Sequence, residues 1–405
     1  MNENENLVPK RRFKEFKNTG TWEQRKLGEV VNFLNGRAYK QQELLESGKY
    51  RVLRVGNFNT NDKWYYSDLE LEENKYANSG DLLYLWATNF GPEIWDEEKV
   101  IYHYHIWKLD LYSSKVDKQY MYTWLITDKE KIKQTTNGTT MVHVTKGNME
   151  QREFQLPINI KEQKKIGSFF KQLDNTIALH QRKLEKSKAL KSAYLSDMFP
   201  AEGDRKPKRR FAGFTDDWEQ RKLKELTEVI TKGTTPKDKS GKGSINFVKV
   251  ENINKISGEI DIKSKITENE HEGYLKRSQL KDGDILFSIA GTLGRTAIVK
   301  KELLPANTNQ ALAIIRLDEG DKNYITTFLN GRAAEDFIKK NPTVGAQPNL
   351  SLEQVGNLLI EIPSLEEQTK IGSFFKQLDD TIALHQHKLE KLQNIKQAYL
   401  NELFV

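Results

Sequence analysis

The chain of 405 residues contains no cysteine. This absence excludes disulfide bonds, zinc–thiolate sites and catalysis by a thiol. No stretch has the length of apolar sequence needed to span a bilayer, and the polar residues 1–13 lack the apolar core of a secretion signal. We therefore expect a soluble, cytoplasmic protein with no membrane partner.

Motifs of nucleotide-dependent enzymes are also missing. A P-loop requires Gly-x4-Gly-Lys-Ser/Thr, and Gly291–Arg295 resembles it only superficially, so we expect a tight turn between strands there. A methyltransferase acting on adenine or cytosine amino groups needs an Asn/Asp/Ser-Pro-Pro-aromatic loop, but Asn341-Pro342 continues with Thr343. We expect no catalytic residues in this chain.

The seven histidines are scattered and define no Ser-His-Asp arrangement. His103 and His105 alternate along an expected strand and could together bind a metal ion. No carboxylate stands at a suitable spacing, however, so a strand edge that faces solvent or DNA is the better interpretation. We expect no metal site.

The length of the chain favours two domains with connecting elements. Lysine and arginine number 64 against 57 aspartate and glutamate, a net charge of +7, and the pI is about 9.0. This balance favours a polyanionic partner such as nucleic acid, although many soluble proteins are mildly basic.

Two segments of the sequence occur twice. Residues 10–30, KRRFKEFKNTGTWEQRKLGEV, return in altered form from Lys208, with WEQRKL in both copies. Residues 162–199 return as residues 367–404 with about 27 of 38 positions identical. The inserts between these repeats, about 30–158 and 231–363, are similar in length but share few residues. The chain is thus two half-units, each with a constant frame around a variable insert.

The longer repeat has the pattern of a helix with a heptad-like apolar seam. A helix of 38 residues would extend on the order of 50 Å, too far to bury its apolar stripe within one small domain. We expect the two copies to pair in antiparallel orientation; the alternative is that each packs on its own insert. The expected seam residues are Ile166, Phe170, Leu173, Ile177, His180, Leu184, Ile371, Phe375, Leu378, Ile382, His385 and Leu389.

The inserts have the pattern of mixed α/β domains. Short β-branched runs bounded by Gly, Asn and Asp predict strands, and Ile325–Lys340 has helical spacing. The predicted fold class is α+β, with two mixed α/β domains separated by two long antiparallel, coiled-coil-like helices in a pseudo-twofold internal repeat. The expected segments are domain 1 at 1–160, the central helix at 161–199, a basic linker at 200–212, domain 2 at 213–364 and the C-terminal helix at 365–405.

This organisation resembles the specificity subunits, HsdS, of Type I restriction-modification systems. The resemblance extends over essentially the whole chain and is carried by the order of its motifs more than by any one of them. In the first insert FLNGRAYK stands where the second has TKGTTPKD, which departs from the family pattern. The motifs are EQxKIGxF at 162–169 and 367–374, W-E-x-x-K-L at the start of each half-unit, Gly233-Thr-Thr-Pro236, and the runs at 283–299 and from Asn307.

The resemblance implies that each insert is a target recognition domain for one half of a split, asymmetric site in double-stranded DNA. It implies that the helices set the spacing and dock two methyltransferase subunits, with restriction subunits joining the complex. S-adenosylmethionine, ATP and magnesium are then cofactors of the partner subunits, with none bound by this chain. The alternative is a coiled-coil scaffold or adaptor without DNA readout.

Candidate DNA contacts are side chains near Gly-rich loops that can bind base edges or phosphates. For any one of them an ordinary solvated loop residue is the competing interpretation. The candidates are Arg37, Tyr39, Lys40, Asn89, Asn137, Thr139 and Thr140 in the first insert, and Lys232, Thr234, Thr235, Lys237, Arg295, Gln347 and Asn349 in the second.

Overall fold

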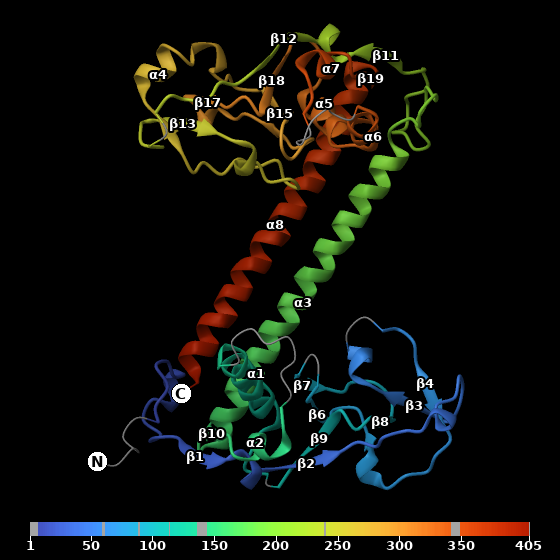
Figure 1. Cartoon of the computed structure of the whole chain (residues 1–405), viewed down its shortest axis with the longest axis vertical. Helices are drawn as coiled ribbons and strands as arrows, with labels where there is room; N and C mark the ends of the chain where they lie inside the picture. Colours follow the sequence, from blue (N-terminus) through green and yellow to red (C-terminus); the bar gives the residue numbers. More distant parts are fainter. Residues whose placement is uncertain are drawn as a thin grey trace. The chain divides into compact units, whose positions relative to one another are not determined.

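The computed structural model describes residues 7–58, 61–87, 90–112, 114–135, 144–238, 240–341 and 349–404. Packing divides the chain into two compact units (Figure 1). Unit 1 comprises residues 1–178 and 390–405, and unit 2 comprises residues 179–389. Both boundaries fall within the two long helices, so each unit holds a globular part and a portion of both helices.

The main sheet of unit 1 has the strand order β2-β9-β6-β7, with every neighbouring pair antiparallel. A second sheet has the order β4-β3-β8-β5 and contains the parallel pair β3-β8. The helices of the first insert are α1, Lys118–Thr135, and α2, Lys146–Glu150. The strands are β2 Val31–Asn35, β3 Tyr50–Leu53, β4 Tyr65–Ser67, β5 Tyr76–Ala77, β6 Leu82–Leu85, β7 Gly91–Ile94, β8 Val100–Tyr102 and β9 Ile106–Leu111.

Unit 2 repeats this topology although the two inserts share few residues. Its main sheet has the order β12-β18-β15-β16, and the second sheet, β14-β13-β17, again contains a parallel pair, β13-β17. The mixed α/β prediction is therefore confirmed for both inserts. The elements are β12 Thr227–Lys232, β13 Ile245–Val248, β14 Lys265–Ile266, α4 Glu268–Glu272, β15 Ile285–Ser288, β16 Thr296–Ile298, β17 Ala306–Thr308, β18 Leu312–Leu317 and α7 Leu352–Gly356.

Two details of the inserts differ from expectation. The single helix predicted over Ile325–Lys340 is two helices, α5 Lys322–Leu329 and α6 Arg332–Lys340. The break occurs because Gly331 adopts an extended backbone and caps the start of α6. His103 and His105 do not alternate along one strand; they flank a turn between β8 and β9.

The repeated segments build the same frame in each unit. The WEQRKL motif forms β1, Glu23–Lys26, and β11, Glu219–Lys222. These strands pair antiparallel with the proline-terminated strands β10, Glu153–Leu156, and β19, Leu359–Ile362. The tryptophan before each strand packs edge-on against an aromatic residue of the following helix, Trp22 on Tyr120 and Trp218 on Tyr324, with 6.1 Å between the ring centroids in both units.

A buried ion pair joins the two repeated segments of each unit. The Arg12 guanidinium binds both carboxylate oxygens of Glu162 at 2.6 and 2.7 Å, and Arg210 binds both oxygens of Glu367 at 2.7 and 2.8 Å. The Glu162 side chain is 1% exposed and that of Glu367 is 0% exposed. The arginine of the KRRF motif and the glutamate of the EQxKIG motif therefore occur together because neither charge is tolerated alone in this environment.

The next residues of the EQxKIG motif fix the helix of each insert against the frame. Gln163 accepts a hydrogen bond from the Asp117 backbone N–H, and Gln368 accepts one from that of Asp321, just before α1 and α5. A Cβ at Gly372 would lie 2.6 Å from the backbone nitrogen of Tyr324. Glycine is therefore required because the long helix approaches the insert helix too closely for any side chain.

The two long helices are α3, Ile160–Asp197, and α8, Leu365–Leu403. Within unit 2 they pair in antiparallel orientation: His180 Nδ1 lies 3.1 Å from His385 Nδ1, and Lys191 Nζ donates to Asp379 at 2.5 Å. Leu184, Ile371, Phe375, Ile382 and Leu389 are buried, and Leu378 is half-buried.

Within unit 1 the remaining portions of the helices also pair in antiparallel orientation. Lys396 forms an ion pair with Asp174 at 2.6 Å, and the Phe170 and Phe404 rings lie 6.0 Å apart. Ile166 and Phe170 belong to the same buried cluster as Tyr120 of α1, so this portion of α3 packs on its own insert as well as on α8. Leu173 and Ile177 are half-buried. The predicted helix pairing is confirmed in each unit, and the alternative contributes at this end of α3.

Candidate nucleic-acid interface

The loops that hold the first candidate residues meet at one end of the main sheet of unit 1. After β2, the Gly36 backbone N–H donates to the Ile106 carbonyl at 3.1 Å. After β6, the Trp86 N–H donates to the His105 carbonyl at 3.2 Å. A Cβ at Gly36 would overlap the His103 carbonyl, so this close approach requires glycine. Residues 103–105, which we term turn 1, lie between the two loops.

Unit 2 has the same backbone arrangement. The Gly233 N–H donates to the Leu312 carbonyl at 3.2 Å, and the Ile289 N–H donates to the Ala311 carbonyl at 2.9 Å. A Cβ at Gly233 would overlap the carbonyls of Thr308 and Asn309. Residues 309–311, termed turn 2, therefore correspond to turn 1 position by position: His103 to Asn309, Tyr104 to Gln310 and His105 to Ala311.

The side chains around turn 1 form a cluster of rings. Tyr104 is 40% exposed and contacts both flanking histidines, with ring centroids 4.4 Å from His103 and 3.9 Å from His105. Trp86 lies 4.8 Å from His105, and its Nε1 donates to the Tyr104 carbonyl at 2.7 Å. The turn therefore presents a largely aromatic surface to solvent.

Burial lowers the pKa of His103 to about 4, with His105 and Arg54 adding charge repulsion in the same direction. The His103 ring is therefore neutral at pH 7. It can offer a hydrogen-bond donor or acceptor to a partner without adding positive charge.

Of the candidates in the first insert, Arg37 and Tyr39 lie beside turn 1, since the Tyr104 N–H donates to the Arg37 carbonyl at 3.0 Å. Arg37 forms an ion pair within the domain, since its Nη2 donates to Glu43 at 2.6 Å. Tyr39 is half-buried, and its ring stacks near His103 with centroids 6.4 Å apart. Lys40 is exposed. Asn89, Asn137, Thr139 and Thr140 lie outside the described residues.

In unit 2, Thr234 and Thr235 lie together beside turn 2. The Arg277 Nε donates to the Thr234 hydroxyl at 3.1 Å, and the Thr235 hydroxyl donates to the side-chain oxygen of Gln310. Lys237 is exposed, with its ammonium 4.6 Å from the centre of the Tyr274 ring.

The remaining candidates of unit 2 are more dispersed. Lys232 is exposed at the end of β12, and Asn349 is exposed and bridges to Ala290 in the loop after β15. Gln347 lies outside the described residues. The sequence Gly291–Arg295 forms part of the turn between β15 and β16, as expected, with Gly291 and Gly294 in the left-handed region.

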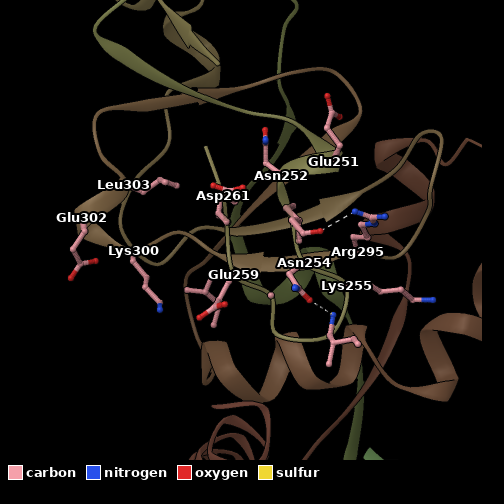
Figure 2. Close-up of a pocket in the computed structure, with 15 residues that line it drawn as sticks. Glu251, Asn252, Asn254, Lys255, Glu259, Asp261, Arg295, Lys300, Glu302 and Leu303 are labelled. Atoms are coloured by element: carbon pink, nitrogen blue, oxygen red, sulfur yellow. Dashed lines mark hydrogen bonds between the residues drawn. The ribbon is translucent and has the colours of Figure 1, made fainter. Parts of the chain in front are cut away.

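Arg295 lines a pocket of about 720 Å³ in unit 2, and none of the other described candidates is among its lining residues (Figure 2). Its Nη1 donates to the carbonyls of Val250 and Ile253 at 3.2 and 2.9 Å. These bonds join the β15–β16 turn to the segment that follows β13. Carboxylates of Glu251, Glu259, Asp261 and Glu302 line the same pocket and disfavour a phosphate there. A DNA contact by Arg295 remains a prediction.

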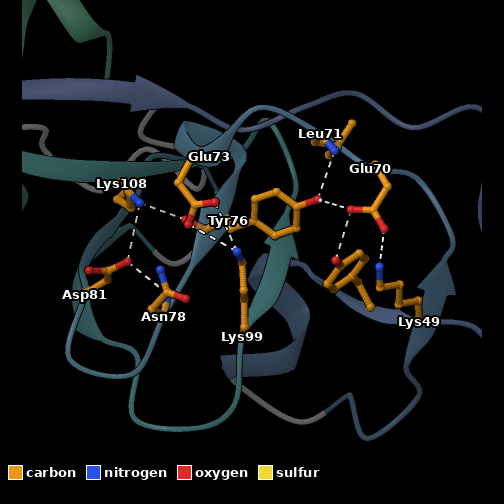
Figure 3. A network of polar contacts seen from close by, with 10 residues as sticks. Lys49, Glu70, Leu71, Glu73, Tyr76, Asn78, Asp81, Lys99 and Lys108 are labelled. Carbon is orange, nitrogen blue, oxygen red and sulfur yellow. Dashed lines mark hydrogen bonds and ion pairs between the residues drawn. The ribbon is translucent and has the colours of Figure 1, made fainter.

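A polar network stabilises the second sheet of unit 1 (Figure 3). Lys49 and the Tyr50 hydroxyl both bind the Glu70 carboxylate, and Lys99 binds Glu73 at 3.1 Å while lying 4.1 Å from the centre of the Tyr76 ring. Because these lysines are paired with carboxylates, they contribute little net positive charge for binding a polyanion.

Within the described ranges, no group of three or more His, Asp or Glu side chains is arranged to hold a metal ion. No helix formed by the described residues is long and apolar enough to cross a membrane.

A family model described as "Type I restriction modification DNA specificity domain" matches the chain twice, over residues 19–188 and 215–394. The chain belongs to this family. Each half-unit thus carries one specificity domain, and the duplicated frame corresponds to the duplicated match.

Relatives of these two specificity domains span nearly the whole chain. The Type I restriction enzyme EcoBI specificity subunit of Escherichia coli is 24% identical over 417 residues, covering 95% of this chain and 85% of that protein. The MjaVIII specificity subunit of Methanocaldococcus jannaschii is 24% identical over 396 residues, covering 94% and 92%. The crystal structure of the Type I S subunit from M. genitalium matches the fold with a TM-score of 0.71 at 16% identity, covering 98% and 99%.

The sequence interpretation of these domains missed several residues at the turns. Trp86, Tyr104 and Gln310 were not among the candidates, and the two histidines of turn 1 were expected only on a strand edge that faces solvent or DNA. Aligning the inserts on their buried strands, LLYL at 82–85 with ILFS at 285–288, would have brought Trp86 opposite Ile289 and drawn attention to these loops.

Proposed function

We propose that this chain gives a Type I restriction-modification enzyme its DNA specificity, with each specificity domain recognising one half of a bipartite, asymmetric site. The main support for the proposal is that turn 1 and turn 2 have equivalent backbones. Turn 1 and turn 2 are held by equivalent backbone hydrogen bonds but carry unrelated side chains. Two identical readers would recognise identical half-sites, whereas two unlike readers on one frame recognise different ones.

The long helices supply the spacing in this proposal. Two readers that bind the same side of a duplex need a separation related to its helical repeat, about 34 Å. Helices α3 and α8 contain 38 and 39 residues, which corresponds to roughly 57 Å of continuous helix. Within each unit, a buried seam and an interhelical ion pair hold the two helices together, Lys191 with Asp379 in unit 2 and Lys396 with Asp174 in unit 1.

The helices also offer the surface on which two methyltransferase subunits would dock. Leu179 and Leu384 occupy equivalent positions in the repeat and are 49% and 50% exposed. Exposed leucines at both equivalent positions suit a partner that binds twice. Catalysis then belongs to the partners: the methyltransferase flips the target base and uses S-adenosylmethionine, and the restriction subunits use ATP and magnesium.

Methylation mapping in cells tests the proposal. Genomic DNA would be sequenced by a long-read method from cells that express the methyltransferase subunit with this chain, and from cells that express the methyltransferase alone. We expect a modified bipartite site only in the first sample. If the complex forms but no new modification appears, the proposal is wrong, and a scaffold role without DNA readout would explain the paired helices better.

A further inference from the structure

We propose that turn 1 and turn 2 are the principal base-reading elements of the two specificity domains, and that Tyr104 and Gln310 are their central specificity-determining residues. This inference rests on the proposed function and deepens it, because it assigns the choice of base to one three-residue turn in each domain.

The first support is geometric. Each turn is closed by a hydrogen bond from the first residue of the next strand, from Ile106 N–H to the His103 carbonyl at 3.0 Å and from Leu312 N–H to the Asn309 carbonyl at 3.2 Å. In both turns the middle side chain is exposed and its two neighbours are half-buried. The backbone thus presents one side chain at the same place in each domain.

The second support is chemical. At these fixed positions the domains carry His-Tyr-His and Asn-Gln-Ala. The solvent-facing position is a tyrosine that contacts three other rings in unit 1 and an amide in unit 2. Side chains that only stabilise a turn need not differ so completely between two turns with one backbone, whereas readers of different bases must.

The third support comes from the neighbouring cations. Arg37 is paired with Glu43, and the Arg277 Nε binds Thr234, so these guanidinium groups brace the loops on either side of the turns. The exposed lysines at equivalent positions, Lys40 and Lys237, suit phosphate contacts. Each domain thus has an exposed lysine, on the loop after its first main-sheet strand, that could bind a DNA phosphate while the turn contacts a base.

The chemistry of each turn indicates the kind of base that it recognises. The Gln310 side-chain oxygen accepts a hydrogen bond from Thr235, which orients the amide and leaves its NH₂ group as a donor and the second lone pair of its oxygen as an acceptor. Glutamine and asparagine amides match the adenine edge in the major groove. The ring cluster of turn 1 instead offers apolar contact, which suits the methyl group of thymine. We therefore expect an adenine contact in one half-site and a thymine contact in the other.

The test uses the complex with the methyltransferase and a plasmid library in which every base of both half-sites is varied singly. Tyr104→Ala should lower methylation of the wild-type site about tenfold or more, the loss expected for one good base contact. It should also relax base preference within one half-site only. Gln310→Ala should do the same for the other half-site. The spacer length should not change in either variant.

Matched controls separate reading from folding. Tyr112→Ala removes a 61% exposed tyrosine just past the far end of β9, and Gln220→Ala removes an exposed amide on the frame strand β11. Both should methylate the wild-type site normally. Retention of base preference in the unaffected half-site shows that each turn variant still folds and assembles.

The outcomes distinguish this inference from the function on which it rests. If the wild-type complex modifies no bipartite site, the proposed function itself fails. If the wild-type complex modifies one but Tyr104→Ala and Gln310→Ala keep full base preference, or relax both half-sites together, only the assignment of the turns is overturned.

Discussion

The repeated frame segments of units 1 and 2 make nearly the same contacts, whereas turn 1 and turn 2 carry different side chains. In both frames an arginine binds a buried glutamate, and a glutamine side chain accepts a hydrogen bond from the residue before the insert helix. At the loop ends, rings in unit 1 stand where amides and small residues stand in unit 2. The comparison shows that buried polar contacts of the frame keep the backbone constant, which frees the exposed turn residues to differ.

The largest effect should come from breaking the frame in one unit at a time. Glu162→Ala and Glu367→Ala each leave an arginine buried without its partner, which costs about 3 to 5 kcal/mol. Hydrogen exchange of the full chain should show faster exchange in α1 for the first variant and in α5 for the second. As a control, Glu366→Ala removes the exposed partner of Lys370 and should change the free energy of unfolding by less than about 1 kcal/mol. Equal exchange of both helices in either variant would mean that the frames are not independent.

A smaller effect should follow from filling the close approach between helices. Gly167→Ala and Gly372→Ala place a Cβ 2.8 and 2.6 Å from backbone nitrogens of Tyr120 and Tyr324. We expect each to lower the free energy of unfolding by about 1 to 3 kcal/mol, measured by urea denaturation. Gly147→Ala meets no atom within 4 Å and should be neutral or slightly stabilising. A neutral Gly372→Ala would show that α5 can move away from α8.

The equivalent lysines test whether both domains contact DNA phosphates in the same way. Lys40→Ala and Lys237→Ala should each weaken binding of the assembled complex to all duplexes alike and should reduce the salt slope by about 1. Fluorescence anisotropy with cognate and non-cognate duplexes at several salt concentrations measures both quantities. A loss confined to the cognate duplex would instead assign that lysine to base recognition.

The smallest expected effect is the change in the free energy of unfolding with pH that His385 causes. Burial lowers the pKa of His385, and repulsion from His180, Lys183 and Lys388 lowers it further. Because the folded pKa lies below the unfolded value near 6.5, the unfolded chain binds more protons as the pH falls, and stability decreases. Between pH 7 and 5.5 we expect only a small loss of stability from this group, because the partly exposed ring is screened by solvent.

Urea denaturation of the wild-type chain and of His385→Gln at both pH values isolates this contribution, since other groups titrate in both proteins. The difference between the two proteins should grow in favour of His385→Gln at pH 5.5. A pH-independent difference would contradict the lowered pKa of His385.

Much of the frame could be predicted from the sequence because it is repeated and periodic. The heptad-like spacing predicted both long helices, and the place of each helix after its own insert predicted their antiparallel pairing. Short β-branched runs bounded by Gly, Asn and Asp predicted the strands of the inserts. The interruption at Gly331 was missed because the apolar spacing continues through it. The partner of Glu162 could not be predicted, since no local pattern reports that Arg12, 150 residues earlier, lies against it.

The candidate interface was harder to predict. Thr234 and Thr235 do lie beside turn 2, because Gly-rich loops after a strand mark close backbone approaches. Lys40 and Lys237 are exposed farther along the same loops. Arg295 reaches the carbonyls of Val250 and Ile253, a tertiary contact that its position in a Gly-rich turn did not reveal. The turn residues were missed because their equivalence depends on hydrogen bonds between strands far apart in the sequence.

The central claim is that base choice resides in the inserts while the frame is common to both units. A chimera in which residues 231–363 are copied in place of residues 30–158 tests it most directly, by methylation mapping of the complex with its methyltransferase. The account predicts a modified site whose two halves contain the same bases, those recognised by unit 2 in the wild-type chain. An assembled, active chimera that still modifies the original asymmetric site would contradict it.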